Sequence, residues 1–153
     1  MARNEHSVVH ATFELERTYD APVGRVWRAL TEPQAKARWF SGDHWEPLER
    51  HMDVRVGGRE LLKGRWESGL VTTFDAVYWD VVPNVRLVYC YQMLLDERKI
   101  SVSLATMQLA PNGQGTRLRV AEQGAFLDGY DDAGSRERGT AHLLDRLGAS
   151  LMT

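Results

Sequence analysis

Four residues on either side of a predicted turn are candidates for an acid–base or metal site: His44, His51, Asp53 and Glu60. Imidazole and carboxylate groups serve as general acids, general bases and metal ligands. The two histidines are seven positions apart across a loop, and this spacing matches no zinc-binding motif. Two interpretations stay open, an acid–base or metal site and ordinary histidines on the surface or an edge strand, and the spacing favours the second. We therefore expect no metal and no other cofactor.

Glu122 is the other candidate for chemistry, since it shares strand parity with Leu118 and Val120 and is predicted to point inward with them. A buried carboxylate has a raised pKa and acts as an acid, a base or an anchor for a ligand. Arg17 and Arg119 are its candidate ion partners. In the alternative interpretation the strand has left the core at this point and Glu122 is solvated, and the pattern slightly favours this alternative.

Large apolar side chains form the third group of candidates. They are as compatible with core packing as with the lining of a cavity, because aromatic residues dominate both. As a lining they would give a mostly apolar pocket in which tyrosine hydroxyls orient a ligand. His142 lies beside the apolar stripe of the last helix, where packing or exposure explains it. No catalytic residue is assigned, and the predicted ligand-binding residues are Trp39, Phe40, Trp45, Trp66, Tyr89, Tyr91, Met93, Met107, Glu122 and Leu143.

The start of the chain predicts a strand followed by two short helices. Apolar and polar residues alternate over 8–18, which is typical of a strand. Four apolar residues then share one helical face: Val23, Val26, Trp27 and Leu30. Pro33 restarts a second helix over 33–40, because proline is tolerated in the first helical turn. Residues 1–7 are predicted to form a flexible tail, followed by a single domain over 8–153.

Six further strands are predicted between a loop at 43–50 and the last helix. Five of them cover 51–56, 59–67, 70–82, 85–93 and 116–120, and one begins at residue 100. In the strand that begins at residue 100, Ile100, Val102 and Leu104 are expected on one face. Gly57-Gly58 and the run Pro111–Gly115 mark tight turns. Residues 126–134 are rich in glycine and aspartate and predict a loop, and Ser135 or a nearby aspartate is expected to cap the helix that follows.

The last helix is the one long helix in the pattern. Its apolar stripe consists of Thr140, Leu143, Leu144, Leu147 and Leu151. Strands joined by short polar turns must be mostly antiparallel, since parallel pairs need long crossovers. The predicted fold class is therefore α+β, with a curved antiparallel sheet of about six to seven strands wrapped around the C-terminal helix and two short helices after the first strand. The curvature leaves room for a pocket between sheet and helix.

The composition excludes several classes of protein. The 153 residues carry a formal net charge of −2 and scattered basic residues, so no nucleic-acid surface is indicated. Cys90 is the one cysteine, which excludes an internal disulfide, and its parity opposite to Tyr89 and Tyr91 places it on the outer face. No run is apolar and long enough for a signal peptide or a membrane span, so we expect a cytoplasmic protein without membrane contact.

Several short motifs occur in combination along the chain. They are Ala21-Pro22, Val26-Trp27, Ala29-Leu30-Thr31, Pro33, Trp39-Phe40, Arg55-Val56-Gly57-Gly58-Arg59, Pro83, Arg86-Leu87-Val88, Gly113, Gly115-Thr116 and the Leu143/Leu147 helix. From residue 8 onward the chain thereby resembles the SRPBCC superfamily (START-like, helix-grip fold). Within it, the chain is similar to the C-terminal domain of the activator of the heat-shock chaperone ATPase (AHSA-type). Ala76 stands where relatives usually have glycine. Thr140 stands where they often have tryptophan, and its smaller side chain would enlarge the cavity.

The resemblance and the aromatic residues together favour binding of a small apolar or aromatic ligand between the sheet and the last helix. The resemblance alone implies two alternatives: a chaperone ATPase-activating or chaperone-interacting protein of the stress response, and a cyclase- or hydrolase-like enzyme using Glu122, Tyr89 or His51. No catalytic motif is present, so an enzyme is the less favoured alternative. The expected partner is a small hydrophobic molecule, with a heat-shock chaperone as the alternative, and the protein is expected to be a monomer or a homodimer.

Overall fold

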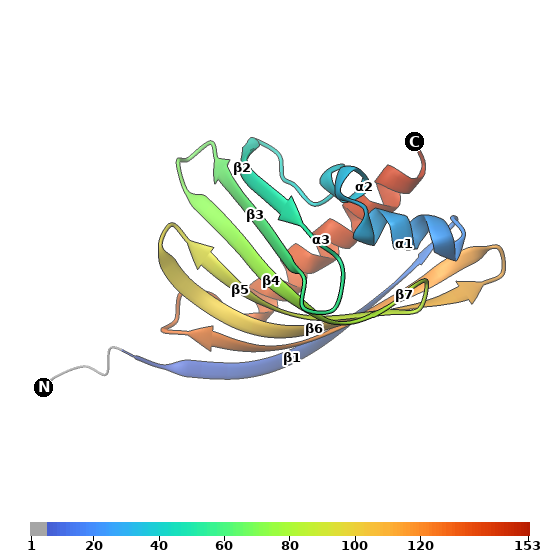
Figure 1. Cartoon of the computed structure of the whole chain (residues 1–153). Coiled ribbons are helices and arrows are strands. Elements are labelled where there is room, and N and C mark those ends of the chain that lie inside the picture. Colours follow the sequence, from blue (N-terminus) through green and yellow to red (C-terminus); the bar gives the residue numbers. More distant parts are fainter. Residues whose placement is uncertain (1–5) are drawn as a thin grey trace, which may run out of the picture.

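A curved sheet wraps around one long helix in the computed structural model, which describes residues 6–153 (Figure 1). In chain order the elements are β1 (Val8–Tyr19), α1 (Val23–Thr31), α2 (Pro33–Ala37), β2 (Trp45–Met52), β3 (Arg59–Trp66), β4 (Val71–Val82), β5 (Arg86–Leu95), β6 (Arg98–Asn112), β7 (Gly115–Leu127) and α3 (Ala133–Leu151). The seven strands form one sheet in the order β1-β7-β6-β5-β4-β3-β2. The predicted α+β helix-grip architecture is therefore confirmed.

Short turns connect each strand from β3 to β7 with the next, so these neighbours pair antiparallel. Asn84 and Asp96 occupy the turns before and after β5 with φ values of 65° and 54°, a left-handed conformation that Asn and Asp adopt at low cost. Gly113 closes the hairpin between β6 and β7 with a φ of 60°. Of the predicted tail, residues 1–5 lie outside the described residues, and Ser7 is hydrogen-bonded to Asp128 through both its amide and its carbonyl.

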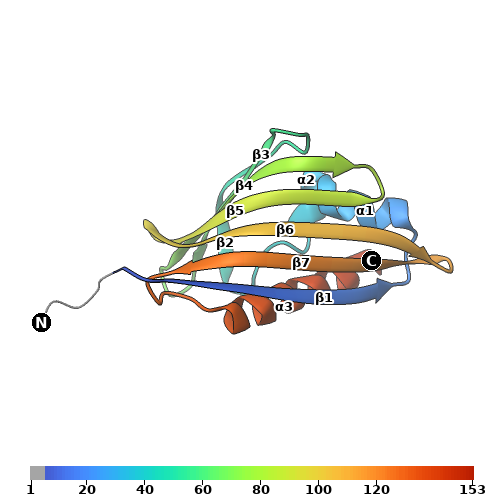
Figure 2. The ribbon, with the colours of Figure 1, turned by 90° about the horizontal axis from the view of Figure 1, so that it is seen from below.

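The helix α3 lies across the concave face of the sheet, as the views in Figures 1 and 2 show. Its apolar stripe is buried at Leu144, Leu147 and Leu151, and the inner face of β7 contributes the fully buried Leu118 and Val120 to the same core. Burying each such side chain contributes about 1.5–3 kcal/mol. The contact between helix and sheet is therefore the main hydrophobic core, and it fixes the height of α3 above the sheet.

The short helices α1 and α2 cover one end of the space between the sheet and α3 (Figure 1). Val26 and Leu30 bury the apolar face of α1. The indole Nε1 of Trp39 donates a hydrogen bond of 2.8 Å to the Ala29 carbonyl, which ties the end of α2 to α1. The second helix is shorter than predicted and ends at Ala37, and a turn carries the two aromatic residues that follow.

The prediction for the second strand is wrong. The pattern predicts a loop over 43–50 and a strand over 51–56, whereas β2 covers Trp45–Met52 and a turn follows it. This strand lies at the edge of the sheet, and both of its faces are largely exposed, so its sequence shows no alternation of apolar and polar residues. Pro47 is tolerated there because an edge strand has backbone amides without ladder partners, and a bulge follows it.

The strand β6 also differs from its prediction. Ile100 is buried, but Val102 and Leu104 are exposed on the outer face, while Ser101 and Ser103 point inward. The register shifts beside Met93 and leaves Ile100 as an extra residue, which inverts the parity of the residues after it.

The last strand, β7, is longer than predicted, since it runs through Phe126 to Leu127 and shortens the loop expected at 126–134. Asp132 caps the helix α3 that follows, because its side chain accepts a hydrogen bond from the Ser135 amide.

Candidate ligand-binding cavity

A cavity of about 500 Å³ lies between the concave face of the sheet, the helix α3 and the turn after α2. Its wall is mainly apolar and aromatic. Further lining residues include Lys36, Leu62, Thr72, Phe74, Asp131, Arg136, Thr140 and His142. All ten side chains predicted to bind a ligand line this cavity, from Trp39 on the turn after α2 to Leu143 on α3. The structure thus brings the predicted residues together, and their role in binding stays a prediction.

The floor of the cavity results from alternating large and small residues on neighbouring strands. Tyr89 pairs with Ala105 across β5 and β6, and Ala105 in turn pairs with Glu122 of β7. In the next row Tyr91 lies between Ala76 and Ser103. The small neighbours let the two tyrosine rings lie along the floor, with centroids 6.0 Å apart, so the space above them stays open.

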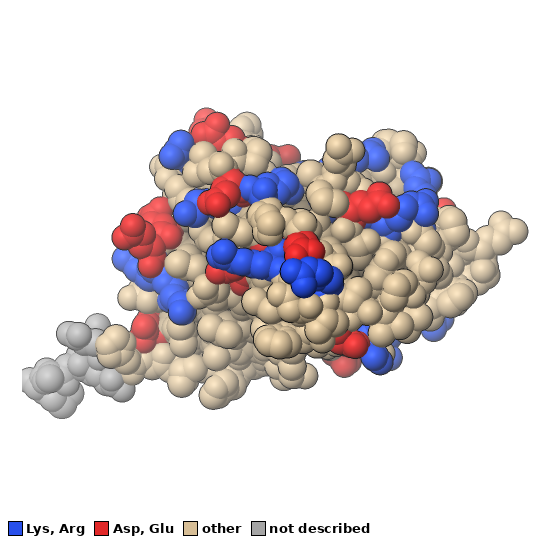
Figure 3. Space-filling model, viewed as in Figure 1, with Lys and Arg blue, Asp and Glu red and all other residues tan. Residues whose placement is uncertain are grey.

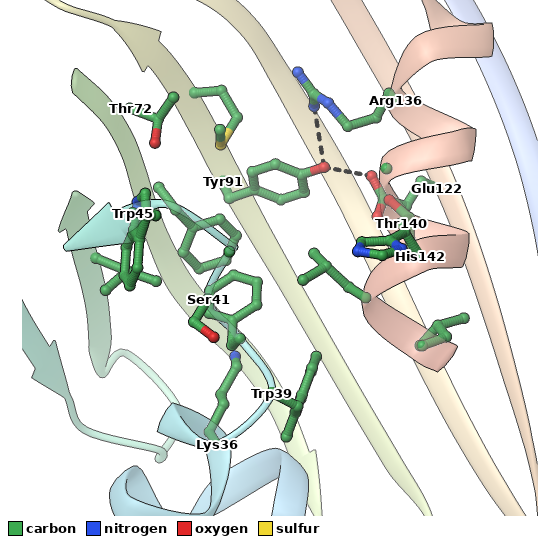
Figure 4. Close-up of a pocket in the computed structure, with 18 of the residues that line it drawn as sticks. Lys36, Trp39, Ser41, Trp45, Thr72, Tyr91, Glu122, Arg136, Thr140 and His142 are labelled. Carbon is green, nitrogen blue, oxygen red and sulfur yellow. Dashed lines mark hydrogen bonds between the residues drawn. The ribbon is translucent and has the colours of Figure 1, made fainter. Parts of the chain in front are cut away.

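A polar cluster occupies the inner wall beneath the first turns of α3. Glu122 accepts a hydrogen bond of 2.6 Å from the Tyr91 hydroxyl, and Arg136 donates one of 3.1 Å to the same hydroxyl (Figure 4). The guanidinium of Arg136 also donates to Ser101 at 2.7 Å and to Asp131 at 3.0 Å. This network fixes the orientation of Tyr91 and of the Glu122 carboxylate toward the cavity.

The environment of Glu122 differs from the predictions in two respects. Its side chain is only 4% exposed, so the interpretation of a solvated carboxylate is wrong. The predicted partners lie elsewhere: Arg17 pairs with Asp145 of α3, and Arg119 lies on the outer face near carboxylates of β1. The alternation of β7 continues past Val120, which keeps Glu122 on the inner face.

Burial dominates the electrostatics of this cluster. Desolvation raises the pKa of Glu122 above its ordinary value, and the hydrogen bond from Tyr91 and the charge of Arg136 offset only part of the effect. Desolvation likewise raises the pKa of Tyr91, and it raises that of Tyr89 well above the ordinary value. Both tyrosines therefore keep their hydroxyl protons at neutral pH and remain hydrogen-bond donors.

The raised pKa of Glu122 predicts a pH-dependent contribution to stability. A carboxyl group that holds its proton more tightly in the folded state contributes stability that is complete below the ordinary pKa of 4.5 and is lost as the pH rises through the folded-state pKa. We expect the free energy of unfolding of the wild type to fall relative to that of Glu122→Gln as the pH rises above 4.5, because the folded protein holds this proton more tightly than the unfolded chain does. Urea denaturation of both proteins at several pH values measures this difference.

The matched control for that experiment is Glu14→Gln, which changes an exposed carboxylate on β1. The difference between its free energy of unfolding and that of the wild type should stay nearly constant over the same pH range. The raised pKa would be contradicted if the free energy of unfolding of the wild type stayed constant relative to that of Glu122→Gln, or rose with pH.

A second buried charge cluster lies at the opposite end of the cavity, beside α2. The ammonium of Lys36 donates a hydrogen bond of 2.8 Å to Glu60, which also accepts one from the Tyr78 hydroxyl. Lys36 is 7% and Glu60 3% exposed. The ammonium also lies 4.5 Å from the Phe40 ring centroid and 5.6 Å from that of Phe74. Aromatic faces and one carboxylate thus replace water around this cation.

Two tryptophans and an arginine shape the rim of the cavity. The indole of Trp45 lies over Gly64 and that of Trp66 over Gly42 so closely that a Cβ atom at either glycine would overlap the ring. Arg146 of α3 reaches across and donates hydrogen bonds to the Trp39 carbonyl at 3.1 Å and to the Ser41 hydroxyl at 2.8 Å. These contacts hold the turn after α2 against α3.

The first group of candidate residues does not form a site. His44 pairs with Glu67 at 3.1 Å on the surface, His51 is exposed on the edge strand β2, and Glu60 is engaged with Lys36. Within residues 6–153 no three side chains of His, Cys, Asp or Glu come together in a metal-binding arrangement. Over the same residues, no helix is both long and apolar enough to cross a membrane.

Lys36 and Arg136 line the cavity but are not among the residues predicted from the sequence. Both are long basic residues, which are usually solvated, and their burial depends on partners distant in sequence. A signal was nevertheless present for each. Arg136 lies four residues before Thr140 and continues the inward stripe of α3, and Lys36 lies three residues before Trp39.

The fold and its internal cavity define a helix-grip protein, a type of fold that serves ligand binding in general. The chain belongs to the family described as activator of Hsp90 ATPase homolog 1-like protein, whose model matches residues 20–152. The predicted resemblance to the SRPBCC superfamily is thereby confirmed.

Solved structures of three bacterial proteins are similar to the chain. A protein of Rhizobium leguminosarum is 42% identical, with 96% of this chain and 97% of that chain covered and a TM-score of 0.92. The Mll3558 protein of Rhizobium loti is 42% identical, with 94% and 99% covered and a TM-score of 0.86. Protein CV1439 of Chromobacterium violaceum is 27% identical, with 93% and 97% covered and a TM-score of 0.78. The comparison with curated proteins gives no match.

Proposed function

We propose that the protein binds a small, mainly apolar molecule, aromatic in part, in the cavity beneath α3. The cavity itself carries this proposal. Its volume of about 500 Å³ falls within the range of small-molecule sites, which are lined mostly by apolar and aromatic side chains with a few polar groups. Protein interiors are otherwise packed as tightly as organic crystals, so a hollow of this size is unusual in a domain of 153 residues.

Native mass spectrometry of the purified protein, followed by extraction under denaturing conditions, tests this proposal. We expect a mass above that of the chain, released on unfolding as a small organic molecule, and the same spectrum gives the oligomeric state. The variant Thr140→Trp, which places an indole in the cavity, should lack the additional mass. An additional mass that persists in this variant would show that the molecule is bound elsewhere and would contradict the proposal.

The family description supports a second candidate, an interaction with a heat-shock chaperone that stimulates its ATPase. On the face shown in Figure 3, acidic and basic residues are interspersed, so a contact there would depend on local pairs of charges. The test is ATP turnover by Hsp90 with increasing amounts of this protein. Stimulation that saturates and is unchanged in Thr140→Trp would support an action through the surface, and constant turnover would exclude it.

A further inference from the structure

The charged side chains that line the cavity are paired, with one exception. Glu122 forms no salt bridge within residues 6–153, although it is 4% exposed. The other lysine, arginine and aspartate side chains in the lining have ion partners: Lys36 with Glu60 at 2.8 Å, Arg136 with Asp131 at 3.0 Å, and Asp43 with Arg146 at 3.4 Å. A buried carboxylate without a cation is costly and tends to take up a proton, so a hydrogen-bond donor or a cation placed in the cavity would stabilise its charged form.

The unused hydrogen-bonding capacity of Glu122 borders the cavity. Its Oε1 accepts the bond from Tyr91, whereas Oε2 accepts none from the described residues. The hydroxyl of Tyr89, two residues along the same strand as Tyr91, also has no hydrogen-bond partner among them. Among the described residues, Ser103 Oγ is the one fully buried side-chain oxygen or nitrogen without a hydrogen-bond partner, so Glu122 Oε2 and the Tyr89 hydroxyl each keep some accessible surface. Both groups therefore remain available to a molecule in the cavity, and Figure 4 shows the bond between Glu122 and Tyr91.

We propose that the ligand presents a hydrogen-bond donor, an ammonium or a hydroxyl group, to Oε2 of Glu122 while its apolar body lies against the aromatic wall. This inference rests on the function proposed above. The hydroxyl of Tyr91 is bonded to the carboxylate, and the rings of Phe74 and Tyr89 lie next to that of Tyr91, with centroids 4.9 and 6.0 Å from it. Aromatic faces next to a carboxylate attract a cation, and they also suit the apolar part of an alcohol or a phenol.

The same arrangement disfavours a ligand that carries a carboxylate. The guanidinium of Arg136 is already bonded to Tyr91, Ser101 and Asp131, and the ammonium of Lys36 is bonded to Glu60. An incoming anion would therefore find no unpaired cation and would place a second negative group near Glu122. Like charges in a site of low dielectric constant repel strongly, so the cavity selects against anions.

Three molecules with one skeleton test this selectivity: naphthylethylamine, naphthylethanol and naphthylacetic acid. Their affinities for the wild-type protein near neutral pH are measured by isothermal titration calorimetry. We expect the amine or the alcohol to bind at least about 10-fold more tightly than the acid, as one hydrogen bond to a charged group allows. An acid that binds as tightly as both other probes would overturn the inference, and this comparison requires no variant.

Glu122→Gln then separates the two kinds of donor. The amide keeps an acceptor oxygen but has no charge, so the affinity for the amine should fall about 10-fold while that for the alcohol changes by less than about threefold. Tyr130→Phe, at an exposed tyrosine, should change none of the affinities. An unchanged affinity for all three probes in Glu122→Gln would overturn the inference but leave the cavity as the binding site. If no probe binds the wild type at all, the proposed function fails together with the inference.

Discussion

Replacing Lys36 with methionine is expected to lower the free energy of unfolding by about 3–5 kcal/mol, the usual effect of removing one partner of a buried ion pair. The substitution preserves most of the side-chain volume, but among the described residues it leaves the 3% exposed carboxylate of Glu60 with the Tyr78 hydroxyl as its remaining hydrogen-bond partner. It also removes the cation from the Phe40 ring. Because small domains are stable by only about 5–15 kcal/mol, urea denaturation will show this change as a large shift of the midpoint.

The double variant Lys36→Met/Glu60→Gln shows whether the stranded charge is the cause. Glutamine keeps an acceptor for Tyr78 and is neutral, so we expect the double variant to recover more than half of the lost stability. Lys99→Met, at an exposed lysine, is the control and should stay within about 0.5 kcal/mol of the wild type. A double variant no more stable than Lys36→Met would attribute the loss to packing rather than to the unpaired carboxylate.

Most of the fold could be predicted because it depends on local periodicity. The apolar stripe that ends at Leu147 and Leu151 identified α3, and the alternation along β7 identified its inner face as far as Glu122. The predictions for β2 and β6 were wrong because the order of apolar and polar residues in these strands does not follow their burial. The edge strand β2 buries neither face completely, and the extra residue Ile100 in β6 inverts the pattern after it. A bulge of this kind depends on the neighbouring strand, which a single segment of sequence does not reveal.

The candidate site likewise has one part that could be predicted from the sequence and one part that could not. Its aromatic wall could be predicted because large apolar side chains on inward positions must lie near the centre of the domain. The polar clusters could not, since each joins residues that are distant in sequence. Lys36 meets Glu60 across 24 positions, and Arg136 meets Tyr91 across 45. Only the curvature of the sheet and the position of α3 decide that these long side chains turn inward instead of toward water.

Thr140→Trp is expected to weaken binding of naphthylethylamine and naphthylethanol by at least about 100-fold, which corresponds to about 2.7 kcal/mol. Thr140 lies on α3 and lines the cavity, as do Glu122 and His142 (Figure 4). An indole at this position would occupy the space that the proposed ligand needs. Since the ring enters a hollow and not a packed core, the free energy of unfolding should not decrease by the roughly 1–3 kcal/mol that overpacking costs.

Two further variants make this prediction specific to the cavity. Thr140→Val has nearly the same shape and should bind both probes within about threefold of the wild type. Ala149→Trp adds the same indole on the exposed side of α3 and should leave binding unchanged. Calorimetry measures the affinities, and urea denaturation establishes that each variant is folded. Wild-type affinity in a folded Thr140→Trp protein would place the binding site outside the cavity, because an indole and a naphthyl probe cannot occupy the same space beneath α3.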